Sequence, residues 1–165
     1  MFRTLRTAAL SLAAITMLAA VPTASQAATT IHVSLWDMGA DVEMPTDLGY
    51  GTPGVDLSNA TMGIKLSQDS APHGVVGFKV TNDSKDTIHE MIVARIEKPG
   101  MSLPYVESEQ KVDEDQAGDK GEVSELDPGQ SGSLTLTLEP GTYLLYCNIA
   151  GHYAAGMWAE FTVTP

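Results

Sequence analysis

Cysteine is almost absent from the 165-residue chain: Cys147 is the only one, so no disulfide can form within the chain. A free thiol in an oxidising compartment is a liability unless something protects it. A bound metal would protect it, and burial in an inert core would do the same. The odd cysteine count therefore favours a metal site but leaves an inert buried cysteine open.

Basic residues are also scarce, with nine Lys and Arg against 21 Asp and Glu and a formal net charge of −12 at pH 7. Arg3 and Arg6 lie in a segment that we expect to be cleaved, which leaves seven basic residues and a net charge of −14. Such a charge argues against nucleic acid and anionic membranes as partners. It suits a soluble protein, or one that docks on a basic partner.

The common catalytic patterns are missing as well. No nucleophile–base pattern, phosphate-binding loop or paired-carboxylate motif stands out, and there is no internal repeat or low-complexity tract. The apolar run near the N-terminus is short for a membrane span, and no basic stop-transfer patch follows it. We therefore expect neither an enzyme nor a membrane-spanning segment in the mature chain.

The N-terminal stretch MFRTLRTAALSLAAITMLAAVPTASQA has the layout of a secretory signal. A basic start is followed by a short apolar centre and the small-residue cut site Ser25-Gln26-Ala27. We expect residues 1–27 to be a cleaved signal peptide. Residues 28–165 would then be a single domain, exported to the periplasm or to the extracellular space.

The rest of the chain has an all-β pattern, because short apolar, β-branched or aromatic runs are separated by Gly, Pro, Asn and Asp. This pattern predicts a Greek-key β-sandwich or barrel of about seven or eight strands. The predicted strands span residues 31–38, 62–67, 74–82, 87–96, 131–139, 141–148 and 157–164.

Two long segments separate these strands. Residues 39–61 are rich in Gly, Pro and Asp, which predicts a long loop with a short helical turn. Residues 104–127, which we call the acidic segment, contain nine acidic residues and two lysines. They are expected to be a solvated, partly helical excursion, or alternatively a docking face for a basic partner.

The residues before the cysteine alternate in the predicted strand 141–148. Tyr143, Leu145 and Cys147 share one face, which places the thiol on the side of the core. Tyr143 is expected to pin the turn at Pro140 and Gly141 with a tyrosine-corner hydrogen bond. Tyr146 should point to the opposite side, toward solvent.

The stretch CNIAGHYAAGM, residues 147–157, contains Cys147, His152 and Met157 with four residues in each gap. A blue-copper site uses two imidazoles and a thiolate in a plane, with a weak axial thioether. The sulfur donors suit Cu(I), and the imidazoles tolerate Cu(II). Gly151 and Gly156 allow the backbone to turn tightly. The stretch therefore predicts a copper loop that lacks one histidine.

The candidates for the missing histidine are His32, His73 and His89. His89 is favoured because it lies in a predicted strand directly after the turn TNDSKDT. That strand could pair across the sandwich with the end of YLLYC. His73 lies in a polar turn beside Pro72, and His32 lies at the start of the first strand, so both are expected at the surface.

The stretch PGTYLLYCNIAGHYAAGM resembles the C-terminal copper loop of the cupredoxins, the family of plastocyanin, azurin and rusticyanin. The upstream VTN…HE resembles the segment that carries the family's first histidine. The spacing of four residues between Cys147 and His152 and four between His152 and Met157 is most similar to rusticyanin and sulfocyanin-like members. The resemblance covers roughly residues 62–165, with 31–38 as a plausible first strand. It implies a cupredoxin-like fold and one copper ion in a type 1 site.

The resemblance also implies roles for single residues. The backbone N–H groups of Glu90 and Ile149 would donate to the Cys147 sulfur and tune the reduction potential. Many cupredoxins have Asn after the first histidine, where it ties the two ligand segments together. Here that position is Glu90, and Asn148 is a candidate substitute. The implied equatorial and axial ligands are His89, Cys147, His152 and Met157.

Three functions follow from these observations. The first is an exported, monomeric electron carrier that exchanges one electron with redox partner proteins as copper cycles between Cu(I) and Cu(II). Electrons would leave through His152 and a small apolar patch of Ile149, Ala154 and Ala155. The alternative is a protein that binds and delivers copper without redox turnover. A fold that serves only as an interaction module is the third, and four intact ligands speak against it.

The remaining methionines of the mature chain are candidates for a copper-carrying surface. Methionines more often fill irregular gaps in a core, and we favour that interpretation here. These residues are Met38, Met44, Met62, Met91 and Met101.

Overall fold

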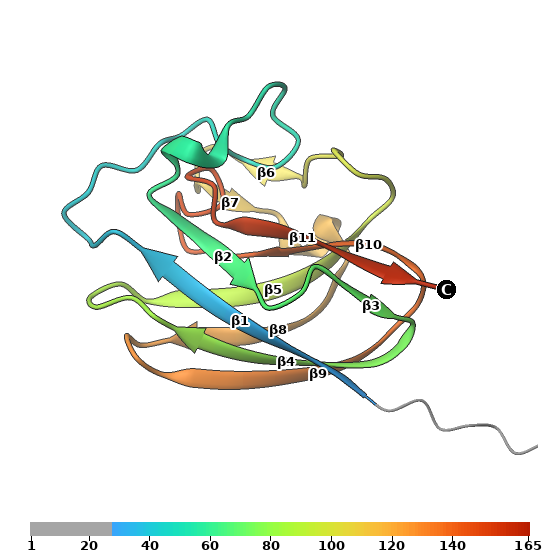
Figure 1. The fold of residues 1–165 in the computed structure, drawn as a ribbon. Coiled ribbons are helices and arrows are strands. Elements are labelled where there is room, and N and C mark those ends of the chain that lie inside the picture. Colours follow the sequence, from blue (N-terminus) through green and yellow to red (C-terminus); the bar gives the residue numbers. More distant parts are fainter. Residues whose placement is uncertain (1–27) are drawn as a thin grey trace, which may run out of the picture.

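The computed structural model describes residues 28–165, so the predicted signal peptide lies outside the described residues. Within this range the chain forms eleven strands, one short α-helix and one 3-10 turn. The strands build two facing sheets and a separate two-stranded ribbon (Figure 1). The predicted all-β sandwich class is confirmed. In the part of the chain that is described, no helix is long and apolar enough to cross a bilayer.

The first sheet has one buried face and one polar face. In β1, Ile31, Val33 and Leu35 are buried while His32 between them is exposed, which is the alternation expected of a half-buried strand. β1 pairs antiparallel with β2 and parallel with β4. The spatial order of the sheet is β2 (Met62–Leu66), β1 (Thr29–Asp37), β4 (Gly74–Asn82) and β9 (Ser131–Leu138).

The second sheet carries the residues around the cysteine. Its central strand, β10, pairs antiparallel with both β11 and β5. Seven of the eight residues of β5 are buried, because this strand is covered on both faces. The spatial order is β3 (Ser70–Pro72), β11 (Trp158–Thr164), β10 (Gly141–Tyr146), β5 (His89–Ile96) and β8 (Asp119–Leu126).

The main core lies between the two sheets. Phe78 from the first sheet and Phe161 from the second meet edge to face, with ring centroids 5.6 Å apart. Tyr143, Leu145 and Cys147 all point into this core, as the strand parity predicts. The Tyr143 hydroxyl donates to the carbonyl of Glu139 at 2.9 Å, which confirms the expected tyrosine corner.

The acidic segment is more ordered than the sequence predicts. It begins as a ribbon of β6 (Tyr105–Val106) and β7 (Lys111–Val112), continues through α1 (Glu114–Ala117) and ends in β8. β8 pairs with β5 and is an edge strand of the second sheet. Val123 is its one buried residue, so most of its charged side chains face water and the strand has a weak apolar signature. The prediction of a solvated excursion is wrong for this strand.

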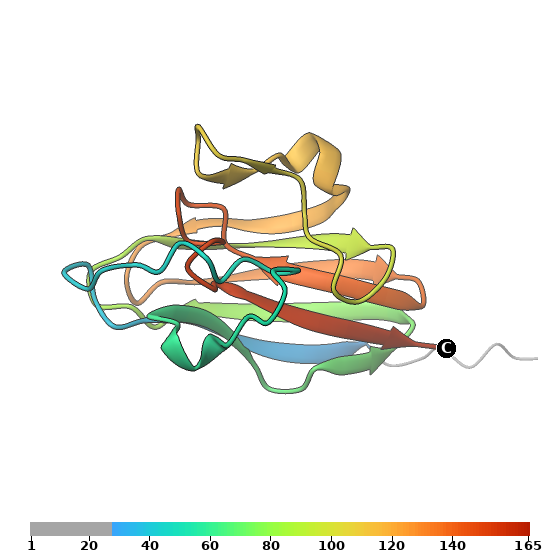
Figure 2. The same cartoon turned by 90° about the horizontal axis from the view of Figure 1, so that it is seen from above.

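A second core lies on the outer face of the second sheet, where β6, β7 and α1 pass over it (the gold segment in Figure 2). Tyr146 is fully buried there, so the prediction that it points toward solvent is wrong. Its hydroxyl donates to Asp119 at 3.0 Å. The cover supplies the apolar surface that buries the outward side chains of β5 and β10. The buried residues of this second core are Tyr50, Ile92, Ala94, Ile96, Leu103, Val112, Ala117, Leu144, Tyr146 and Tyr153.

The long loop between β1 and β2 packs against the C-terminal part of the chain. It contains the predicted short helical turn, η1 (Leu57–Asn59), which Asp56 caps by accepting from the Ser58 N–H. The Leu48 N–H donates to the Ala154 carbonyl at 2.8 Å. The Trp158 indole N–H donates to the Leu48 carbonyl at 2.7 Å. These bonds hold the loop beside residues 147–157.

Candidate metal centre

The centre forms where two neighbouring strands of the second sheet end. His89 is the first residue of β5, and Cys147 directly follows β10. The register pairs Tyr146 with Ile92, so the two ligand candidates arrive at the same end of adjacent strands. His89 therefore reaches the cysteine within one sheet, and not across the sandwich as the sequence suggested. Residues 147–157, which we call the ligand loop, then connect β10 to β11.

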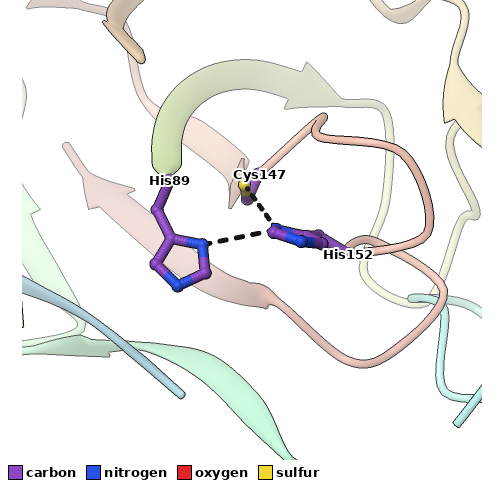
Figure 3. A group of neighbouring side chains, drawn as sticks. All are labelled: His89, Cys147 and His152. Carbon is purple, nitrogen blue, oxygen red and sulfur yellow. Dashed lines mark hydrogen bonds between the residues drawn. The ribbon is translucent and has the colours of Figure 1, made fainter. Parts of the chain in front are cut away.

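The loop and the strand bring three donor atoms together (Figure 3). The Nδ1 atoms of His89 and His152 are 3.3 Å apart, and the Cys147 Sγ is 3.4 Å from the same His152 nitrogen. The three donor atoms all lie within 4.8 Å of one another. His89 and Cys147 are fully buried, and His152 is only 4% exposed. Two nitrogen donors and one sulfur donor therefore cluster in the buried interior, and only His152 has an exposed fraction.

Met157 closes the ligand loop. Its side chain is fully buried in the same core cluster as Cys147. Its carbonyl accepts from the Cys147 N–H at 3.1 Å, and its N–H donates to the His152 carbonyl at 3.0 Å. Gly151 and Gly156 have φ angles of 84° and 97°, so both adopt the left-handed conformation that tight turns require.

The other two histidines are not brought to this centre. His32 lies on the exposed face of β1, and His73 is exposed between β3 and β4. Both positions agree with the surface placement expected from the sequence.

Both clustered imidazoles are held neutral. Burial, followed by the neighbouring His89, lowers the pKa of His152 to about 4, against an opposing effect of Asp37. Burial also lowers the pKa of His89, against the opposing effect of Asp37. Neutral imidazoles keep a lone pair on one ring nitrogen, which is the form that binds a metal.

The cysteine is strongly shielded. Burial raises the pKa of the Cys147 thiol to about 12, although hydrogen bonds from the backbone N–H groups of Glu90 and Ile149 favour the thiolate. These are the two donors that the resemblance implies. Because the thiol is protonated without a metal, metal binding must release its proton.

Asp37 is a member of the centre that the sequence did not reveal. It ends β1, and its Oδ2 lies 2.6 Å from the Nε2 of His89. Burial raises the pKa of Asp37, but hydrogen bonds from Ser84, His89 and Gly39 outweigh it and hold the pKa below its usual value. An ionised carboxylate only accepts, so His89 donates from Nε2 and keeps its Nδ1 lone pair toward the centre.

Glu90 ties the two ligand segments together. Its Oε1 accepts from the Asn148 N–H at 3.1 Å, so the acid itself makes the connection for which Asn148 was the candidate. Burial, followed by the nearby Glu114, raises the pKa of Glu90 to about 7. The Asn148 side chain instead bonds to the acidic segment: it accepts from the Val112 N–H at 2.7 Å and donates to the Val112 carbonyl at 3.0 Å.

The predicted exit patch beside His152 is only partly exposed. Ala155 is fully buried, while Ile149 and Ala154 are half-buried. His152 also lines a cavity of about 370 Å³, which we call the His152 cavity. Besides His152, it is lined by Gly39, Ala40, Val42, Glu43, Met44, Thr61, Met62 and Thr87.

The model of the sulfocyanin (SoxE) domain matches residues 58–165, about two thirds of the chain. The chain belongs to the sulfocyanin family of cupredoxins. The matched range includes both strands that end at the centre and the whole ligand loop. The resemblance drawn from the loop spacing is therefore confirmed.

Two curated proteins match this cupredoxin over a short segment. It is 56% identical over 41 residues to auracyanin-B of Chloroflexus aurantiacus, covering 24% of this chain and 17% of that protein. It is 49% identical over 41 residues to the copper-resistant cuproprotein CopI of Pseudomonas aeruginosa, covering 24% of this chain and 23% of that protein. The matches thus span less than a quarter of either relative.

Solved structures show the same fold at low sequence identity. Auracyanin from Roseiflexus castenholzii has a TM-score of 0.51 at 21% identity, covering 85% of this chain and 100% of that chain. Rusticyanin from Thiobacillus ferrooxidans has a TM-score of 0.51 at 17% identity, covering 84% of this chain and 79% of that chain. These likenesses show the fold alone.

The donors fit copper, which is the cofactor that this family binds. Two neutral imidazoles and one cysteine sulfur converge, and a thioether is buried in the same core cluster. Soft sulfur donors together with imidazoles are the set that accommodates both Cu(I) and Cu(II). The prediction of copper as the cofactor is confirmed.

Proposed function

We propose that His89, Cys147 and His152 are the equatorial ligands of one type 1 copper and that Met157 is the axial ligand. The protein then exchanges one electron at a time with redox partner proteins. The convergence of the two histidines and the Cys147 sulfur in the buried interior carries this proposal. A site saturated by protein ligands leaves no open position for a substrate, in contrast with catalytic metals. An electron carrier, and not an enzyme, is the function that such a site supports.

The residues around the ligands suit electron transfer. Bound copper supplies the one-electron couple, and the chain supplies a fixed and dry environment for it. Asp37 orients His89, and the N–H groups of Glu90 and Ile149 stabilise the thiolate. Because the donors already converge in a buried pocket, little rearrangement is needed when an electron arrives or leaves.

We also propose the setting in which this carrier works. Residues 1–27 are a cleaved signal peptide, and residues 28–165 form one monomeric domain in the periplasm or outside the cell. The basic start and apolar centre of the N-terminal stretch support export. The excess of acidic residues supports a basic redox partner.

Copper delivery without redox turnover is the second candidate. The similarity to a copper-resistant cuproprotein favours it, and so does Met44, a thioether beside the exposed edge of His152. The two functions differ in colour. An intensely blue oxidised protein with a reversible one-electron wave supports the carrier. Colourless and labile Cu(I) binding supports delivery.

A visible spectrum of the copper-loaded protein, together with a metal count, tests the ligand set. We expect one copper per chain and an intense blue band from copper–thiolate charge transfer. His89→Ala should abolish the band, whereas His32→Ala and His73→Ala should keep it, because of these three histidines only His89 lies in the cluster with the Cys147 sulfur. If His73→Ala loses the band and His89→Ala keeps it, His73 and not His89 is the copper ligand.

A further inference from the structure

The copper pocket opens to the outside at one ligand. His89, Cys147 and Met157 are fully buried, and only His152 has an exposed fraction, of 4%. That exposed edge faces the His152 cavity, whose volume of about 370 Å³ greatly exceeds that of one ion. Of the four expected ligands, His152 is therefore the one that lines this cavity.

Two methionines line the same cavity. Met44 is 38% exposed and lies on the loop after β1, whereas Met62 is 5% exposed and begins β2. The terminal methyl group of Met44 packs against the ligand loop, since a Cβ added to Gly151 would lie 3.3 Å from it. The wall of the cavity thus includes a half-exposed methionine and a buried methionine together with His152.

The five methionines outside the ligand loop differ in exposure. Met62 and Met91 are buried, as we expected for all five, and Met62 also lines the His152 cavity. The expectation is wrong for Met38, which is 67% exposed, and Met101 is half-buried. Met44 is 38% exposed and, unlike Met38, lines the His152 cavity. Filling a core gap does not account for its position, whereas a thioether is a soft donor that selects Cu(I).

We propose that the His152 cavity is the entry site for Cu(I), and that the Met44 and Met62 thioethers bind the ion before His152 and Cys147 take it over. This inference rests on the proposed copper site and adds the route by which the site is loaded. The acidic chain, including Glu43 at the cavity, attracts cations toward this opening.

The transfer is a ligand exchange and not a redox reaction. Copper remains Cu(I) throughout, and the thioether sulfurs are not oxidised. Bonds from copper to Met44 and Met62 break as bonds to His152 and Cys147 form. The Cys147 thiol gives up its proton to solvent, as thiolate ligation requires.

The test follows copper uptake by the metal-free protein from Cu(I) bound to bathocuproine disulfonate, whose coloured complex fades as copper leaves it. Met44→Leu keeps the apolar volume but removes the sulfur. We expect uptake to slow by on the order of tenfold, the lower end of what removing a supporting group costs a metal site. The final copper count, and the blue band after oxidation, should match the unaltered protein.

Two controls separate sulfur chemistry from cavity shape. Val42→Ala alters the same wall of the cavity without touching a sulfur, and Met101→Leu removes a thioether that does not line it. Both should load at the normal rate. An unchanged rate in Met44→Leu, or equal slowing in Val42→Ala, would overturn the entry site. Failure of the unaltered protein to turn blue would instead overturn the proposed function.

Discussion

At the scale of single residues, the two histidines of the centre have different surroundings. His89 is fully buried and its outer nitrogen contacts the Asp37 carboxylate, whereas His152 faces a cavity. A negative charge one imidazole away from the metal stabilises the higher charge of Cu(II). Asp37 should therefore hold the reduction potential down.

Replacing Asp37 by Asn tests this effect. The amide can still form a hydrogen bond with His89 but carries no charge. Cu(I) is therefore stabilised relative to Cu(II). We expect copper to remain bound and the reduction potential to rise by tens of millivolts, where about 59 mV is a tenfold change for one electron. Voltammetry measures the shift. Asp83→Asn, which removes an exposed carboxylate bonded to Ser34, is the matched control and should leave the potential nearly unchanged.

The axial position offers a second test at this scale. A thioether favours Cu(I), a harder oxygen donor favours Cu(II), and an apolar side chain removes the axial stabilisation of Cu(II). We expect Met157→Gln to lower the reduction potential and Met157→Leu to raise it, with copper bound in both. If neither substitution moves the potential, Met157 is not the axial ligand. Cys147→Ser should instead abolish the blue band.

The sequence revealed the ligand candidates because three of them lie within one eleven-residue stretch and the fourth follows a recognisable turn. Asp37 gave no such signal, because it meets His89 across 52 positions and sits in no local motif. We expected a hydrogen bond between the two ligand segments but assigned it to the Asn148 side chain. The Glu90 side chain makes it instead, and the sequence could not distinguish the two because either side chain can form such a bond. Residue type and spacing predict ligands better than they predict supporting contacts.

At the scale of elements, the second sheet is buried on both faces. Its inner face packs against the first sheet, and its outer face lies under the acidic segment and parts of the long loop. The sequence left this cover unrecognised because its apolar residues are spread thinly among charges. Val112 and Ala117 in the acidic segment and Leu103 just before it are buried, but they are too far apart to show a regular apolar period.

Replacing one buried leucine and one exposed leucine tests how much the second core stabilises the fold. Leu103 is 5% exposed and lies in the second core, whereas Leu57 is 39% exposed on η1. We expect Leu103→Ala to lower the free energy of unfolding by about 2–3 kcal/mol, as for other buried leucines. Leu57→Ala should cost less than about 0.5 kcal/mol. Urea denaturation of the metal-free protein measures both, and equal costs would mean that the cover adds no stability.

At the scale of the whole molecule, charge is the dominant surface property. The net charge of −12, or −14 without residues 1–27, extends an attractive field toward cations and basic proteins. Nine of the 21 acidic residues lie in the acidic segment, whose carboxylates mostly face water. One side of the acidic segment thus covers the outer face of the second sheet, and its other side presents negative charge to solvent.

Ionic strength should therefore control the rate of electron exchange. With a basic redox protein, we expect the bimolecular rate to fall as salt is added, because charges are screened beyond about 8 Å at physiological ionic strength. With ferricyanide, an anion, the rate should rise over the same range. Stopped-flow absorbance at the blue band measures both. A flat salt dependence with both reagents would mean that charge plays no part in the encounter.

The pairing pattern has a consequence for the lifetime of the thiol. β3 pairs with β11 and β1 with β4, so the framework is assembled from segments far apart in the chain. Folds dominated by such pairings form in milliseconds to seconds, about a thousandfold or more slower than local helical bundles. During that interval Cys147 is open to oxidants that can convert it to sulfenic acid and beyond. Once the sheets close, the thiol is fully buried, so the time for which it is exposed to oxidants ends when folding is complete.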